Sequence, residues 1–394
     1  MEETRTSVNR IAVVIIFLLL AAIGAVIVYA AVSKGAVYSS WEVADETGTI
    51  EDAGFIRTDS GFIAYNHDGA EGHARDGSIT WKISYHLSDP IADACGAYAV
   101  FADRGGQTVA LSDGTGANYS FSVSGEIEEV RIASQGVTAI RSSEGTSDQI
   151  FVYDINGNML LDMRTDVKKA GFPITFGFSS DGTKMITSYL EVGQENKSWL
   201  TFYNFGDVGQ NYADKIVGSF SYDAEIVADV RFLDNNNALV FYSDGCDLYK
   251  FREIPEKIRS IDCPGGIYAI CDHGGRFAIS TRDEAGASKI DIFGTDGKSI
   301  SSLVTGMGFD RMSLENDELI LISSDSCVIY KINGKEKFRA RMDERIKMMT
   351  PGNGKAEYIV AGEKTVTHIH LRTLKEDAKQ ASGSANTDIT QDAD

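Results

Sequence analysis

The chain has 394 residues, and 37 Lys and Arg against 57 Asp and Glu give it a formal net charge of −20 at pH 7. A field of that sign repels phosphate backbones, so nucleic acid is excluded as an expected partner. A chain of this length can bury a large core without disulfides. Its five scattered cysteines are therefore predicted to be buried free thiols, with one bridge involving Cys246, Cys263 or Cys271 left open.

The first predicted element is a membrane-spanning helix over residues 11–32, which carry no charge (IAVVIIFLLLAAIGAVIVYAAV). A helix of that length is about 33 Å long, close to the thickness of the hydrocarbon core of a bilayer. The apolar region of a cleaved signal peptide is shorter, roughly 7–15 residues. The sequence therefore predicts an uncleaved signal-anchor, with the membrane as the partner of this segment.

The charges that flank this run predict its orientation. Arg5, Arg10 and the terminal amine precede it, whereas Lys34 alone follows it closely. Because Lys and Arg are retained on the cytoplasmic side, residues 1–10 are expected to be a cytoplasmic arm. The rest of the chain is expected to be extracellular, on a single-pass protein of a bacterial cell membrane.

The region after the anchor repeats a strand, an Asp-Gly or Asn-Gly turn and a second strand. Its clearest copies are at residues 150–163 (IFVYDINGNMLLDM), 290–303 (IDIFGTDGKSISSL) and 328–340 (VIYKINGKEKFRA), with a weaker copy at 73–84 (HARDGSITWKIS). Asn-Gly and Asp-Gly supply the positive φ angles that two-residue hairpin turns require. These segments are therefore predicted to be hairpins of the third and fourth strands of a repeating unit.

A second repeated hairpin precedes many of these and joins the first two strands of each unit. Copies include FGFSSDGTKMITSY and VRFLDNNNALVFYSD, and the predicted third strands begin about 36 to 50 residues apart. Four strands at this period are typical of the blades of a β-propeller. We expect an all-β propeller of about eight four-stranded blades, with seven as the alternative, and an insertion at residues 206–215 in the outer hairpin of the fourth.

Both ends of the propeller are expected to contribute to its last blade. The unit at residues 346–374 lacks a fourth strand, which residues 37–44 (VYSSWEVA) could supply, and such closure would remove exposed sheet edges. The domain is thus predicted to span residues 33–374. Residues 375–394 are polar and lack aromatic side chains, so we expect a disordered tail.

Two of these turns carry a resemblance to known propellers. FSSDGTKMI at residues 178–186 resembles the inter-strand turn of WD40-like and TolB-like propellers, and YDINGN at 153–158 resembles hairpins of PQQ-like propellers. The whole layout resembles an uncharacterised family of membrane-anchored propeller proteins from Firmicutes. The resemblance implies fold and location, and it brings no assigned activity.

One candidate metal site follows from the predicted closure of the ring. His368 and His370 alternate along a predicted strand and so share one face, and the last blade would abut the first, which carries His67 and His73. Imidazoles with nearby carboxylates could then bind one divalent ion. The alternative is four independent histidines and no ion.

No other catalytic or cofactor motif is evident, and no cofactor is expected. Residues 154–158 (DINGN) do not fit a calcium loop, because glycine comes too early and no bidentate acid follows, so a plain hairpin turn is predicted. GxSxG, GxGxxG and Walker motifs are absent. Paired carboxylates from distant strands stay open.

Three functions remain. The first is a non-catalytic binding platform that docks an envelope protein or a cell-wall glycan. The second is an envelope glycan hydrolase or lyase, for which carboxylates with raised pKa values would cluster in the ring. The third is a ligand sensor, which would need a partner in the bilayer because the cytoplasmic arm is short.

Overall fold

The computed structural model describes residues 37–378, apart from 146, 165–170, 194–195, 224 and 285. Residues 41–372 form one compact unit, and the short flanks 37–40 and 373–378 belong to a second. The predicted arm and span lie outside the described residues. Within the described ranges, no helix combines the length and the apolar character needed to cross a bilayer.

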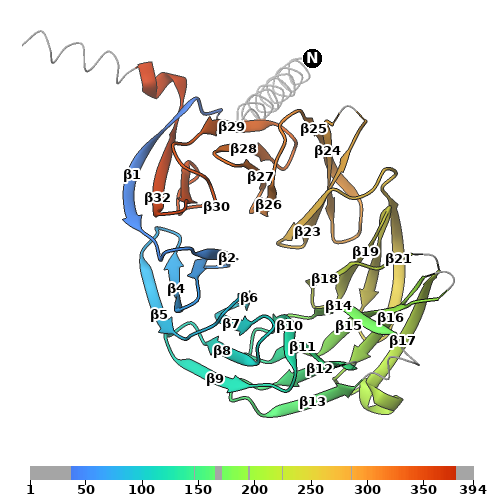
Figure 1. Cartoon of the computed structure of the whole chain (residues 1–394). Coiled ribbons are helices and arrows are strands. Elements are labelled where there is room, and N and C mark those ends of the chain that lie inside the picture. Colours follow the sequence, from blue (N-terminus) through green and yellow to red (C-terminus); the bar gives the residue numbers. More distant parts are fainter. Residues whose placement is uncertain are drawn as a thin grey trace, which may run out of the picture. The chain divides into compact units, whose positions relative to one another are not determined.

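The main unit is a ring of eight four-stranded antiparallel sheets, an eight-bladed β-propeller (Figure 1). Seven blades use four consecutive strands each, and their first strands are the innermost. In order these strands are β2 (Gly54–Thr58), β3 (Gly61–Tyr65), β4 (Gly69–Ala74) and β5 (Ile79–Ser84); β6 (Pro90–Cys95), β7 (Tyr98–Asp103), β8 (Thr108–Ser112) and β9 (Asn118–Ser122); β10 (Glu126–Ile132), β11 (Thr138–Glu144), β12 (Ser147–Tyr153) and β13 (Met159–Arg164); β14 (Phe172–Phe178), β15 (Lys184–Glu191), β16 (Lys197–Asn204) and β17 (Ile216–Asp223); β18 (Asp229–Asp234), β19 (Asn237–Tyr242), β20 (Gly245–Phe251) and β21 (Pro255–Asp262); β22 (Ala269–His273), β23 (Arg276–Arg282), β24 (Ser288–Gly294) and β25 (Ser299–Thr305); β26 (Arg311–Glu315), β27 (Glu318–Ser323), β28 (Ser326–Lys331) and β29 (Glu336–Arg341).

The eighth blade is built from both ends of the chain. It contains β30 (Met348–Pro351), β31 (Glu357–Ala361) and β32 (Thr365–Arg372), and β1 (Ser40–Gly48) pairs with β32 as its outer strand. The prediction that residues 37–44 supply the missing strand of the last blade is confirmed, although the strand itself spans residues 40–48. The count of eight blades is confirmed as well.

Two further predictions concern the insertion at residues 206–215 and the tail at residues 375–394. The insertion in the fourth blade is confirmed, and it holds two short 3-10 turns, η1 (Gly209–Asn211) and η2 (Ala213–Lys215), between β16 and β17. The predicted disordered tail begins differently, because residues 374–378 form a helical turn. The Glu376 carboxylate accepts hydrogen bonds from the Thr373 backbone N–H and hydroxyl at its start. Residues 379–394 lie outside the described ranges.

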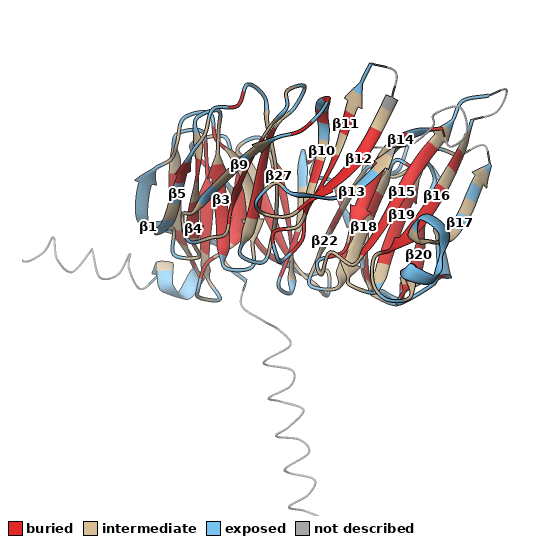
Figure 2. Ribbon diagram, turned by 90° about the horizontal axis from the view of Figure 1, so that it is seen from below, coloured by how far each residue is buried: buried red, intermediate tan, exposed pale blue. Residues whose placement is uncertain are grey.

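The core lies between the blades. Buried side chains concentrate in the second and third strands, whereas outer strands such as β1 are largely exposed (Figure 2). Each apolar cluster draws on two neighbouring blades; one contains Val100 and Leu111 of the second blade with Ile140 and Phe151 of the third. A four-stranded sheet of this kind is apolar on both faces, so it needs a neighbour on each side to bury them.

The outer hairpin turns differ from the prediction. Of the Asn156-Gly157 pair only the glycine has a positive φ, at 80°, and its N–H donates to the Asp154 carbonyl oxygen over 3.0 Å. Asp76-Gly77 has the same arrangement, with a φ of 86° at the glycine. These are type I turns followed by a left-handed glycine, as in a G1 bulge, rather than two-residue turns with two positive φ angles. The side chain of the first turn residue also stabilises the turn: Asp154 Oδ1 accepts a hydrogen bond from the Asn156 N–H over 2.9 Å.

The same turns also join neighbouring blades. A Cβ at Gly157 would lie 2.7 Å from Phe121 of the preceding blade, and one at Gly77 would lie 3.7 Å from Ile359 of the eighth blade. The glycines at 116, 297 and 334 face β5, β21 and β25 in the same way. These five hairpin turns therefore lie against the blade before them, so the turn sequence contributes to the assembly of the ring.

Substitution of these glycines tests that contact. Gly157→Ala and Gly77→Ala both force a left-handed residue to carry a Cβ, which costs about 1–2 kcal/mol. Only Gly157→Ala also displaces Phe121, which adds roughly 1–3 kcal/mol of overpacking. Thermal unfolding should therefore show a lower Tm for Gly157→Ala than for Gly77→Ala. Equal losses would show that the turns do not press on the neighbouring blade.

Candidate functional site

His73 is placed where the predicted metal site needs it, in the seam between the first and eighth blades. Its ring is buried and stacks on Phe62, with ring centroids 4.5 Å apart, and Phe62 packs against Met348 and Ile359 of the eighth blade. Its Nδ1 lies 3.0 Å from the Gly77 carbonyl oxygen. Its Nε2 is 3.6 Å from Glu71 Oε2, beyond hydrogen-bond distance, and is a buried nitrogen without a hydrogen-bond partner.

His368 faces the same seam from β32. Together with Asp76, Gly77 and Asp45 it lines a cavity of about 250 Å³ between the two blades. Its Nε2 lies 3.8 Å from a carboxylate oxygen of Glu357, and it too is buried without a hydrogen-bond partner. Two of the four histidines, His73 and His368, thus lie at the seam between the first and eighth blades.

The other two histidines do not complete a metal site. His67 lies in the turn before β4 and His73 lies near the far end of that strand, so the two residues stand at opposite ends of β4. His67 contacts the Leu87 carbonyl oxygen instead, with its Nδ1 3.0 Å away, and His370 stands opposite Glu357 in the β31–β32 pair. Among the residues that the structure describes, no group of three or more His, Cys, Asp or Glu side chains is arranged to hold a metal ion.

The innermost strands carry a set of buried or half-buried ion pairs that link blades. Arg231 on β18 contacts Asp229 on the same strand and, at 2.9 Å, Asp272 on β22. Arg57 on β2 pairs with Glu315 on β26, from the first blade to the seventh. These pairs place charge in the centre of the ring, where the hydrolase hypothesis predicts carboxylates.

Two carboxyl groups flank Arg131 on β10. Asp93 on β6 accepts the Ile132 backbone N–H over 2.9 Å. Glu129 accepts from Arg131 at 2.8 Å and from the Thr175 hydroxyl of the fourth blade at 3.1 Å.

Burial raises the pKa of Asp93 above its ordinary value, although Arg131 opposes the shift. Burial likewise raises the pKa of Glu129 against the opposing effect of Arg131 and Arg141. The raised pKa values that the hydrolase hypothesis requires are therefore present, on groups that also join three blades.

The five cysteines are all free thiols, as expected. Cys246, Cys263, Cys271 and Cys327 are buried, and Cys95 is half-buried. Burial raises the pKa of the Cys263 thiol to about 11 and that of the Cys327 thiol to about 12. At neutral pH such thiols are protonated and unreactive.

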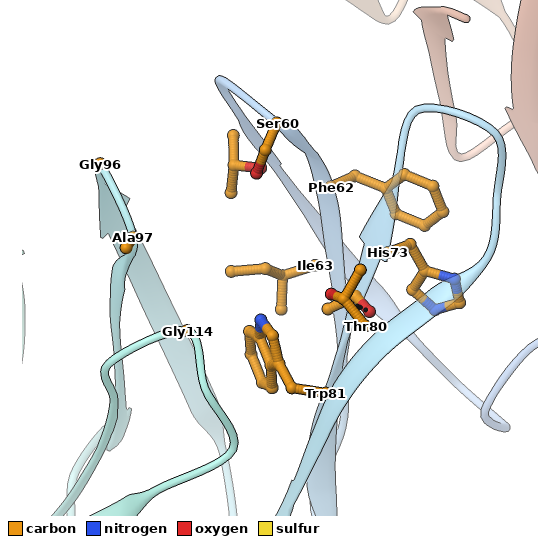
Figure 3. A pocket seen from close by; sticks show the side chains of 11 residues that line it. Ser60, Phe62, Ile63, His73, Thr80, Trp81, Gly96, Ala97 and Gly114 are labelled. Atoms are coloured by element: carbon orange, nitrogen blue, oxygen red, sulfur yellow. Dashed lines mark hydrogen bonds between the residues drawn. The ribbon is translucent and has the colours of Figure 1, made fainter.

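A second cavity of about 250 Å³ lies between the first and second blades, among their hairpin turns (Figure 3). The indole of Trp81 and the side chain of Ile63 stand on one side, and Gly96, Ala97 and Gly114 of the second blade stand on the other. Trp81 is cross-strand from Gly72, whose missing side chain leaves room for the indole: a Cβ there would lie 2.2 Å from the indole nitrogen.

Trp81 lies in the hairpin at residues 73–84, a weaker copy of the repeat. A signal for its position exists in the hairpin at residues 73–84. If the turn is at Asp76-Gly77, the pairing of the two strands places Gly72 close to opposite Trp81. Because glycine has no side chain, the indole can lie over the sheet at that position. The bulge that sets this register, between Gly72 and His73, is not visible in the sequence.

The fold and these sites define an all-β propeller whose polar groups lie at inner strands and blade seams, without a recognisable catalytic motif. The chain belongs to the DUF5711 family, a family of unknown function, whose model matches residues 34–371. Among solved structures, apo AztD from Citrobacter koseri is similar in fold, with a TM-score of 0.50 at 10% identity. That match covers 74% of this chain and 87% of the AztD chain. The comparison with curated proteins found no match.

The raised pKa of Asp93 gives a testable pH dependence. A group whose pKa is higher in the folded than in the unfolded chain stabilises the fold at acid pH, and this stabilisation is lost as pH rises through the folded pKa. Asp93→Asn removes the buried charge and keeps an oxygen for the Ile132 N–H. We expect its Tm to exceed that of the wild type at pH 7 by on the order of 2 °C, and the difference to shrink toward pH 5.

Asp325→Asn is the control with the opposite sign. Hydrogen bonds from Arg341 and Ser326 lower the pKa of Asp325, so its contribution is present at neutral pH and lost on acidification. Its substitution should lower the Tm at pH 7 and have no effect below the folded pKa. Calorimetry across this pH range would contradict the assignment if both variants shifted in the same direction.

Proposed function

We propose that this protein is a membrane-anchored, extracytoplasmic binding platform, a non-catalytic propeller that docks an envelope protein or a cell-wall component. The observation that carries the proposal is the position of β1. The strand begins at Ser40, shortly after the apolar run that ends at residue 32, and it is hydrogen-bonded into the eighth blade. A span at residues 11–32 would therefore be joined to the ring itself by residues 33–39.

This short linker limits how far the ring can move from a bilayer. Seven residues reach at most about 25 Å even when fully extended. A ring held that closely samples only ligands and partners near the membrane surface. The formal net charge of −20, which lies outside the predicted arm and span, favours neutral or cationic ligands over anionic lipid or nucleic acid.

The inner ion pairs support the non-catalytic role over the hydrolase alternative. Asp93 and Glu129 have the raised pKa values of candidate acids, which is the observation in favour of that alternative. Each is engaged with a neighbouring blade, through Ile132 and Thr175 respectively. We assign them to the assembly of the ring. Turnover of a wall glycan that disappears in Asp93→Asn and Glu129→Gln would establish the hydrolase instead.

Cysteine accessibility tests the proposed topology. Because the native thiols are buried or half-buried, a single introduced cysteine reports on its own position. Lys298→Cys lies on an exposed turn of the sixth blade, where the Lys298 side chain is 76% exposed, and Ser7→Cys lies in the predicted arm. A membrane-impermeant maleimide should label Lys298→Cys in intact cells and Ser7→Cys only after lysis. The reverse pattern would overturn the extracytoplasmic assignment.

In vivo crosslinking of the intact chain, followed by mass spectrometry, tests the docking role. We expect reproducible capture of an envelope protein, with crosslinks confined to one face of the propeller. Crosslinks between copies of this chain alone would point to a glycan or small-molecule ligand within the same role. Capture of cytoplasmic proteins by residues of the ring would contradict the proposal.

A further inference from the structure

The cavity between the first and second blades has one aromatic wall that is open to a ligand. Ile63 and Trp81 pack toward the second blade, whereas Phe62 and the stacked ring of His73 lie on the other side of the sheet, toward the eighth blade (Figure 3). Although residues 62 and 73 contribute to the lining, their rings are occupied with each other. The indole of Trp81 is thus the aromatic group that this cavity offers.

The second feature of the cavity is the polar edge of that indole. In the described part of the protein, the Trp81 Nε1–H makes no hydrogen bond, whereas the corresponding group of Trp199 donates to Glu191 over 2.8 Å. An indole N–H that is half-enclosed usually finds an acceptor. A bound molecule with a hydroxyl or carbonyl oxygen would supply one.

Small hydroxyl groups line the same cavity. The Thr58 and Ser60 hydroxyls lie 3.4 Å apart at the β2–β3 turn and are exposed, so each can still exchange hydrogen bonds with a ligand. The Thr80 hydroxyl donates to the Gly72 carbonyl oxygen over 3.0 Å and keeps its acceptor capacity. The opposite wall, residues 96, 97 and 114, has almost no side chain and leaves space over the indole.

The character of the lining excludes charged ligands. Apart from the occupied imidazole of His73, no side chain of the cavity is ionisable. An anion would meet no cationic partner in a protein with a net charge of −20, and an organic cation is normally held by several aromatic faces or a carboxylate. A volume of about 250 Å³ is slightly below the ~300 Å³ at which pockets for drug-sized ligands begin. The ligand is therefore neutral and about the size of one ring.

We propose that this cavity binds one neutral saccharide ring, which stacks its C–H face on Trp81 and turns its hydroxyl edge toward Thr58 and Ser60. A sugar ring combines an apolar face with a rim of neutral donors and acceptors, and the cavity offers the counterpart of each. The inference rests on the proposed binding role and deepens it, since it selects a glycan over a protein as the ligand of this site.

Binding of defined sugars to the full chain in detergent tests the proposal. The probes are N-acetylglucosamine, glucose and their β-1,4-linked trimers, followed by saturation-transfer NMR and tryptophan fluorescence. We expect at least one probe to bind in the millimolar range, at a Kd of about 1 mM, as befits a single shallow ring site. Trp81→Ala should weaken binding at least tenfold, and Trp81→Phe should weaken it less because it keeps a stacking face.

Two further variants separate loss of the site from loss of the fold. Ala97→Leu fills the cavity from the exposed opposite wall, so it should weaken binding tenfold or more while the Tm stays unchanged. Trp199→Phe removes a tryptophan of the fourth blade and should leave the affinity unchanged. Failure of all four probes at saturating concentrations, or binding that survives both Trp81→Ala and Ala97→Leu, would overturn the proposal.

This outcome is independent of the proposed topology and docking role. If no sugar binds but Lys298→Cys is labelled from outside and an envelope protein is captured, the platform stands and the saccharide site is wrong. If sugars bind at Trp81 but Lys298→Cys is protected in intact cells, the site stands and the extracytoplasmic role is wrong.

Discussion

The whole propeller depends on closure of the ring by the eighth blade, whose outer strand β1 is hydrogen-bonded to β32. Each blade buries its two apolar faces only when a neighbour covers both, so seven blades in an open arc would leave two faces in water. The eighth blade removes these faces: Met348 and Ile359 pack on Phe62 of the first blade. Its outer strand comes from the opposite end of the chain, and the Arg372–Glu42 ion pair at 3.1 Å joins residues 330 positions apart.

Polar contacts between blades fix the relative position of neighbouring blades more closely than apolar packing does. Between the seventh and eighth blades, the buried Lys337 ammonium contacts Glu318 over 2.5 Å and the Tyr358 hydroxyl over 2.7 Å. On the inner strands, Arg231 and Arg57 each reach a carboxylate of another blade. Apolar packing tolerates small slips, whereas a paired charge fixes one position. The charges in the centre of this ring are thus explained by assembly, and the cavities open to a ligand lie among hairpin turns and at blade seams.

Much of the fold could be predicted because the repeat is local. The hairpin predicted at residues 150–163 is formed by β12 and β13, since turn residues such as Asp154 and Gly157 mark hairpin ends wherever they occur. The sites depend on register and could be predicted only in part. His73 and His368 reach one seam because the ring closes, but His67 lies a full strand length away. The hairpin at residues 73–84 places Gly72 close to opposite Trp81, but the bulge that sets the final register is not visible in the sequence. The partners of Asp93 and Glu129 come from other blades, so no local pattern indicates those contacts.

The closing strand also sets a temporal order for the biogenesis of the molecule. β1 is among the first parts of the domain to be synthesised, and its partner β32 is made last, so the strand stays unpaired until almost all of the ring has been translated. Contacts of such long range form slowly. A waiting strand is open to mispairing with other chains, and the acidic side chains of Glu42, Asp45 and Glu46 disfavour such pairing by charge. The strand that completes the last blade is therefore also exposed to mispairing during folding, and its own acidic side chains reduce that risk.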